Sequence, residues 1–211
     1  MNNVALDIET ETRSFYPKQD TRRILSIQLG TDVWQELYYA DGKPGENLAD
    51  GVTRIRKLAA DDVVFVGHYI KKFDCEHLST FCGVNIQHCE DTFTHAGLSQ
   101  LSSRSLASAC SHFGIPASHK HILNSWKAKA QSLPEFKSHF EKCVSEAQEL
   151  HGISREDAQR SVLKDMLVGW AIMCAYADFV SKPSKKHDFY QYAIGDVKAE
   201  YLLFKKLEGI E

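Results

Sequence analysis

The chain has 211 residues, of which 43% are hydrophobic and 25% charged, and its formal net charge is −3. This length permits one large domain, or a domain with an insertion, rather than two equal domains. The lack of net positive charge argues against a non-specific binder of duplex nucleic acid. The six cysteines include no CxxC pair and the N-terminus has no signal peptide, so we expect a protein of the reducing cytoplasm, or of the host cytoplasm if a phage encodes it.

The first half of the chain predicts an α/β fold with a mixed sheet. Apolar runs and alternation predict four strands, at 4–10, 23–30, 33–40 and 63–67. A polar stretch with a proline predicts a loop at 10–22, and two amphipathic stretches predict helices at 47–59 and 73–81. Three strands, a helix, a strand and a helix in this order are typical of an α/β protein.

The second half of the chain predicts helices almost throughout. They are expected at 103–113, 132–150, 154–180 and 192–207. The sequence Ser132-Leu133-Pro134-Glu135 resembles a capping box at the start of the second of these helices. The most apolar run, 166–177, is shorter than the roughly 20 residues that span a bilayer. It therefore predicts a buried helix, and no membrane contact is expected.

The first predicted strand carries two acids on one face. Side chains alternate along a strand, so Asp7 and Glu9 share a face while Val4, Leu6 and Ile8 take the other. Two adjacent carboxylates repel each other and prefer water to a partly buried sheet. The pair therefore predicts either a bound cation or a strand that ends in solvent with two surface acids.

Two further patterns in the chain contain acids. Asp74 stands at the start of the helix that follows the buried strand 63–67, where the helix dipole favours a carboxylate. Tyr192 and Asp196 are four residues apart, which places them one turn apart on the same helix face. Taken singly, each pattern also fits an ordinary helix-terminal acid or a core tyrosine beside a surface aspartate.

In this order the three patterns resemble the motifs of the DEDD superfamily of 3′–5′ exonucleases. The matching residues are Asp7-Ile8-Glu9, Phe73-Asp74 and Tyr192 with Asp196. Gln191 stands where the other branch has histidine, so the chain is similar to the tyrosine branch, which includes ribonuclease D and the proofreading domains of family A DNA polymerases. The resemblance covers essentially the whole chain. It implies a ribonuclease H-like mixed sheet flanked by helices, in a single domain 1–211 with a helical insertion at about 125–180.

The resemblance also assigns roles to the matching residues. Two divalent metal ions, Mg²⁺ or Mn²⁺, suit a group of carboxylates because both prefer hard oxygen ligands. Asp7 would bridge the two ions, Glu9 and Asp196 would complete the water-activating site, and Asp74 would hold the second ion largely through water. Tyr192 would orient the attacking water, since an unperturbed tyrosine pKa of about 10 makes it a poor base.

Substrate contacts are predicted by the resemblance at four positions: Thr10, Glu11, His68 and Phe73. The chain departs from the family at Tyr69, which occupies the place where the second motif usually has asparagine, and the surrounding loop is one residue longer than usual. Contacts that depend on this asparagine are therefore not carried over to the chain.

The function expected from the sequence is hydrolysis of single-stranded DNA from its 3′ end to nucleoside monophosphates. We expect a free-standing phage or bacterial replication accessory that proofreads, with a separate polymerase or replication protein as a partner. Trimming of RNA 3′ ends or of short oligoribonucleotides is the alternative among enzymes. A catalytically silent module that binds nucleic acid or protein is the alternative outside them.

Overall fold

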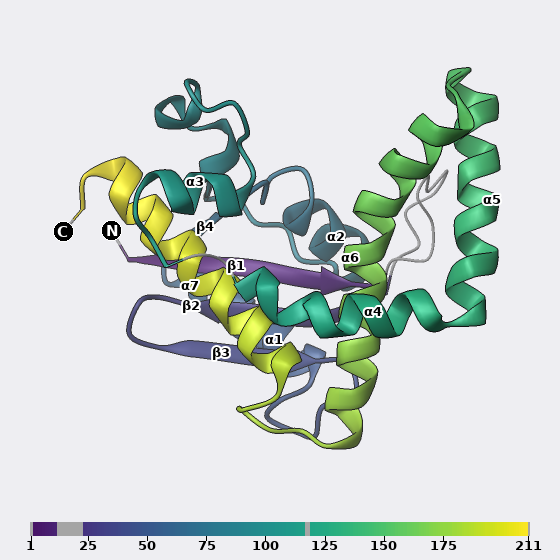
Figure 1. The fold of residues 1–211 in the computed structure, drawn as a ribbon. Coiled ribbons are helices and arrows are strands. Elements are labelled where there is room, and N and C mark those ends of the chain that lie inside the picture. The colour runs from purple at the N-terminus through teal and green to yellow at the C-terminus, as the bar shows by residue number, and fades with distance from the viewer. Residues whose placement is uncertain (1, 12–22, 117–118, 211) are drawn as a thin grey trace. The chain divides into compact units, whose positions relative to one another are not determined.

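The computed structural model describes residues 2–11, 23–116 and 119–210, which form two compact units (Figure 1). The first unit comprises Met1–Glu9, Ile24–Lys120 and Tyr190–Glu211. The second comprises Thr10–Arg23 and His121–Phe189. Most of the predicted loop at 10–22 lies outside the described residues.

The first unit is an α/β structure. Its strands are β1 (Asn3–Thr10), β2 (Ile24–Gly30), β3 (Gln35–Tyr39), β4 (Val64–Gly67) and β5 (Cys89–Asp91). Its helices are α1 (Leu48–Ala60), α2 (Asp74–Cys82), α3 (Leu106–His112) and, from Tyr190 onward, α7 (Asp188–Glu208), with short 3-10 turns η1 (Thr92–Thr94) and η2 (Ala96–Leu98). The predicted α/β class is therefore confirmed, and the one strand that sequence patterning missed is β5.

The five strands form one mixed sheet with β1 at its centre. The strand order is β3-β2-β1-β4-β5. β2 and β3 pair antiparallel, whereas β1 with β4 and β4 with β5 pair parallel. Parallel neighbours run in the same direction, and Ala5 of β1 pairs with Val66 of β4, so the C-terminal end of β4 lies beside the middle of β1.

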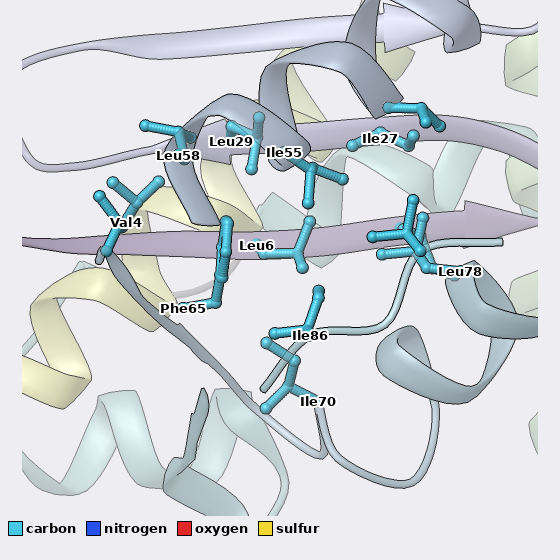
Figure 2. Close-up of a cluster of buried hydrophobic side chains, with 14 of the residues drawn as sticks. Val4, Leu6, Ile27, Leu29, Ile55, Leu58, Phe65, Ile70, Leu78 and Ile86 are labelled. Carbon is cyan, nitrogen blue, oxygen red and sulfur yellow. The ribbon is translucent and has the colours of Figure 1, made fainter. Parts of the chain in front are cut away.

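The two faces of β1 have different roles. Val4, Leu6 and Ile8 belong to a large apolar core that includes residues of α1 and α2. Figure 2 shows this core, with Val4 and Leu6 labelled. Burial of each such side chain contributes about 1.5–3 kcal/mol to folding, which fixes the register of the strand. On the opposite face, Ala5 packs with Val197 of α7, so the alternation predicted from the sequence is confirmed.

The second unit is helical. It contains α4 (Asn124–Ser132), α5 (Pro134–His151) and α6 (Arg155–Ser181), with the 3-10 turn η3 (His119–Leu123) at its boundary. α5 and α6 share an apolar core that includes Phe136, Val144 and Met166. The run 166–177 lies within α6, and none of the helices in the described ranges is long and apolar enough to cross a membrane.

The start of α5 corrects one prediction. Its N-cap is Leu133 rather than Ser132, and no side chain caps it. Pro134 takes the first helical position, which suits its fixed φ. The residue before a proline avoids the helical region, and Leu133 is extended, with ψ 133°. The Ser132 hydroxyl instead donates to the Lys129 carbonyl at 2.6 Å, so the predicted capping box is wrong.

Candidate active site

The first two predicted acids lie on the α7 face of β1. Ile8, between them, points into the opposite core, which leaves Asp7 and Glu9 together on this face. Glu9 is buried, whereas Asp7 is partly exposed. The strand therefore carries one buried and one partly exposed acid on the same face.

Asp74 is hydrogen-bonded directly to the strand that carries these acids. The backbone N–H of Ile8 donates to Asp74 Oδ1 at 2.9 Å. Asp74 is the first residue of α2 and its side chain is only 3% exposed. The parallel pairing of β1 and β4 makes this contact possible, because it brings the turn after β4 to the second half of β1.

Gly67, the last residue of β4, permits this close approach. A Cβ atom at this position would lie 2.9 Å from the Leu6 carbonyl oxygen and 2.9 Å from Ile70 Cβ. Real Cβ atoms do not make contacts this short, so any side chain here would push β4 away from the residue that precedes Asp7.

α7 supplies the remaining predicted residues. Tyr192 and Asp196 are both buried, one turn apart on the helix. The Tyr192 hydroxyl donates a hydrogen bond to the Glu9 carboxylate. The third predicted motif therefore meets the first one through a direct contact.

Glu200 is a fifth acid that sequence reasoning missed. It follows Asp196 by four residues, which places it on the same face of α7, and it is only 4% exposed. It accepts a hydrogen bond from the backbone N–H of His68. Its Oε2 atom is buried and, among the described residues, has no hydrogen-bond partner. The continuing spacing of four after Tyr192 and Asp196 was the only sequence signal for it.

These five acids, which we call the carboxylate cluster, destabilise one another's charged forms. Burial raises the pKa of Asp7 well above its usual range, and the charges of Glu200, Glu9, Asp74 and Asp196 raise it further. Burial raises the pKa of Asp74 to about 8, although the hydrogen bond from Ile8 opposes this shift. Burial and the charges of Asp74 and Asp196 also raise the pKa of Glu200. Without a counter-charge, the cluster therefore favours bound protons.

Tyr192 is affected in the same direction. Burial raises the pKa of its hydroxyl well above the usual value, and the charges of Glu9, Asp196 and Asp7 add to the shift. A tyrosinate is thus strongly disfavoured at this position. The hydroxyl can donate or accept hydrogen bonds, but it cannot serve as a base near neutral pH.

The donor set suits a hard divalent cation. Carboxylate oxygens are the ligands that Mg²⁺ and Mn²⁺ prefer. A cation would relieve the repulsion between the acids and give the buried Oε2 of Glu200 a partner. As the side chains stand in the described ranges, no three of His, Cys, Asp and Glu are arranged to hold one ion. The residue types thus fit such an ion, but the side chains would have to change position to bind it.

The four predicted substrate residues occupy two different settings. His68 and Phe73 lie on the turn between β4 and α2, in the same unit as the cluster. His68 Nε2 donates to the Arg104 carbonyl at 2.6 Å, and its Nδ1 is 2.9 Å from Thr92 Oγ1, so both ring nitrogens hold the turn in place. Phe73 packs against the core of the first unit and contacts the ring of His77, with 4.4 Å between ring centroids and 42° between the ring planes.

Thr10 and Glu11 belong to the second unit. Thr10 is the last residue of β1, directly after Glu9, and its side chain is buried. The backbone N–H of Glu11 donates to the Arg23 carbonyl at 2.8 Å. Of the four predicted substrate residues, His68 and Phe73 thus belong to the same unit as the cluster, and Thr10 and Glu11 belong to the other.

Comparison with known proteins identified no relative. No family model, no curated protein and no solved structure matched the chain. Function is therefore inferred from the site and from the sequence motifs that it contains.

Proposed function

We propose that the chain is a metal-dependent 3′–5′ exonuclease that hydrolyses single-stranded DNA to nucleoside monophosphates, on a ribonuclease H-like fold. Support for the fold comes from the five-stranded mixed sheet, with β1 at its centre and acids at the C-terminal end of this strand. Support for the activity comes from the motifs that resemble the tyrosine branch of the DEDD superfamily.

One contact carries the proposal: the hydrogen bond from the Ile8 backbone to Asp74 at 2.9 Å. It joins the second motif to the middle of the first. The Tyr192 hydroxyl on Glu9 joins the third motif to the same strand. Packing alone gives these three motifs no reason to meet at one place, because burial of acids such as Glu9, Asp74 and Asp196 opposes folding.

The cluster would hold two divalent ions through Asp7, Glu9, Asp74 and Asp196, with Glu200 beside them. When bound, the ions would supply Lewis-acid activation of water and neutralise charge on the phosphate. The protein residues position these ligands: Ile8 N–H orients Asp74, and Tyr192 orients Glu9. A hydroxyl that remains protonated can also hydrogen-bond a water without removing its proton.

The test uses matched single-stranded DNA and RNA oligonucleotides, labelled at the 5′ end, with Mg²⁺, Mn²⁺ or EDTA. We expect a ladder that shortens from the 3′ end, that requires metal and that stops at a blocked 3′ terminus. Faster shortening of DNA than of RNA supports the proposed substrate, and the reverse order favours the RNA-trimming alternative. Products from internal cleavage, or shortening in EDTA, would contradict the mechanism. Binding without hydrolysis by the folded protein would favour a silent binding module.

A further inference from the structure

Tyr69 adopts a backbone conformation that its residue type disfavours. Its φ is +75°, in the left-handed region, where only Asp62 among the other described non-glycine residues is found. Glycine, asparagine and aspartate enter this region at lower cost than an aromatic residue. Strain of this kind persists where the surroundings impose it, and it concentrates at functional positions.

The backbone of the turn is held by contacts that do not involve the tyrosine ring. Asp91 Oδ1 accepts the Tyr69 N–H at 2.9 Å, and Asp91 Oδ2 accepts the Lys71 N–H at 3.3 Å. The Tyr69 carbonyl accepts the Phe73 N–H at 3.2 Å. An asparagine at position 69 could therefore occupy the same turn with less strain.

The ring itself is exposed but supported. Tyr69 is 41% exposed, one of few large apolar side chains with this exposure among the described residues. It makes an edge contact with Phe93, with ring centroids 5.1 Å apart and planes at 76°. The ring is thus fixed on one side while a large part of it remains open to solvent.

The turn that carries this ring also contacts the carboxylate cluster. The preceding residue, His68, donates its backbone N–H to Glu200, and Asp74 follows five residues later. Lys71 and Lys72 on the same turn are exposed. An exposed aromatic ring next to exposed cations is the combination with which proteins bind single strands, by stacking on bases and by attraction of phosphates.

We propose that the Tyr69 ring is a stacking platform for a nucleobase near the 3′ end of the bound strand. This inference rests on the proposed function for its substrate. Stacking tolerates any base because every base has a π-face, so the contact adds affinity without reading sequence.

The test measures binding without hydrolysis. Fluorescent single-stranded DNA is titrated with the full chain in Ca²⁺ and, separately, in EDTA. Compared are the wild type, Tyr69→Asn, Tyr69→Phe, and Phe81→Ala as a control. Phe81 is 42% exposed and lies on α2 of the same unit, without a positive φ. We expect Tyr69→Asn to weaken binding about tenfold, and Tyr69→Phe and Phe81→Ala to bind like the wild type.

Two further measurements separate stacking from a structural role. We expect Tyr69→Asn to melt at a higher temperature than the wild type, because strain is relieved. With oligonucleotides that carry one abasic site at successive positions from the 3′ end, we expect one position at which the wild type and Tyr69→Asn bind equally. A lower melting temperature for Tyr69→Asn, unchanged binding, or no such position would overturn the proposal.

The outcomes distinguish this inference from the proposed function. Hydrolysis by the wild type with unchanged binding by Tyr69→Asn would remove the stacking role alone. Tyr69-dependent binding without any hydrolysis would support stacking and remove the nuclease. Absence of any binding by the wild type would overturn the stacking proposal.

Discussion

The two units of the molecule treat acidic side chains in opposite ways. All buried carboxylates among the described residues belong to the first unit: Glu9, Asp74, Asp91, Asp196 and Glu200. In the described part of the second unit no carboxylate is buried, and acids instead form surface pairs such as Glu141 with Arg155 and Asp157 with Arg160. Exposed pairs of this kind contribute little to stability.

This contrast distinguishes residues that stabilise the fold from residues that the candidate site requires. The second unit follows the usual pattern of apolar core and charged surface. The first unit buries acids with raised pKa values, which opposes folding. Asp91 is an exception with a structural explanation, because its carboxylate caps three backbone N–H groups. The other four raise the pKa values of acids around them by their charges, and buried acids with perturbed pKa values are typical of a functional site.

The largest effect is expected for Asp7→Ala. It should reduce metal-dependent hydrolysis by at least roughly a thousandfold, while the metal-free protein melts at a higher temperature because a source of repulsion is removed. Single-turnover assays and thermal melts with and without Mn²⁺ measure both. The matched control is Glu149→Ala, an exposed acid of the second unit, which should change neither. Wild-type turnover in Asp7→Ala would remove the cluster as the active site.

Glu200 separates charge from hydrogen bonding within the cluster. Glu200→Gln keeps an acceptor for the His68 N–H, whereas Glu200→Ala leaves this donor buried and unpaired. We expect both to reduce hydrolysis and the stabilisation by Mn²⁺, by roughly ten- to hundredfold in activity. Only Glu200→Ala should destabilise the metal-free protein, by about 1–3 kcal/mol. If Mn²⁺ stabilises Glu200→Gln as much as the wild type, the charge of Glu200 does not contribute to metal binding.

The metal-free protein should lose stability as the pH rises. The pKa of Asp74 is about 8 in the folded protein against 3.8 for the ordinary side chain. Between these values the folded state binds more protons than the unfolded state, so the free energy of unfolding decreases with increasing pH. Thermal melts in EDTA should show a fall of several degrees across this window, and Mg²⁺ should flatten it. A melting temperature that rises throughout this range would contradict the burial of these acids.

The smallest effect is expected in the second unit. Ser154 caps α6 by accepting the Asp157 N–H at 3.1 Å. Ser154→Ala should reduce stability by about 1 kcal/mol, a fall of about 2–4 °C in melting temperature for a domain of this size. Hydrolysis and the response to Mn²⁺ at 25 °C should not change. A change in either would mean that the second unit contributes directly to the chemistry.

Sequence reasoning succeeded where a pattern is local. The alternation along β1 predicted which face carries Asp7, and helical spacing predicted that Tyr192 and Asp196 share a face; both follow from backbone geometry alone. Only the resemblance predicted that these positions meet, because the pairing of β4 with β1 is a tertiary contact that no local pattern shows. A glutamate in a charged helix is usually exposed, so the spacing of four after Asp196 was the only local sign that Glu200 is buried.

Two other differences have similar causes. β5 has three residues, too few for a period of two to be visible, and it is defined by its pairing with β4. The predicted capping box was wrong because the Ser–x–x–Glu pattern takes no account of Pro134. This proline occupies the first helical position, so α5 begins one residue later than the pattern predicts. In both, a neighbour in space or a constraint on the backbone outweighed the sequence pattern.

The central position of β1 has a consequence for the order of folding. The cluster combines residues 7 and 9 with residues 196 and 200, so its contacts close almost the longest loop in the described chain. Loops of this length form slowly, whereas neighbouring helices such as α5 and α6 pack through contacts much closer in sequence. During refolding, helical signal should therefore recover first. The capacity to be stabilised by Mn²⁺ should return only in the slowest phase, when α7 docks on β1.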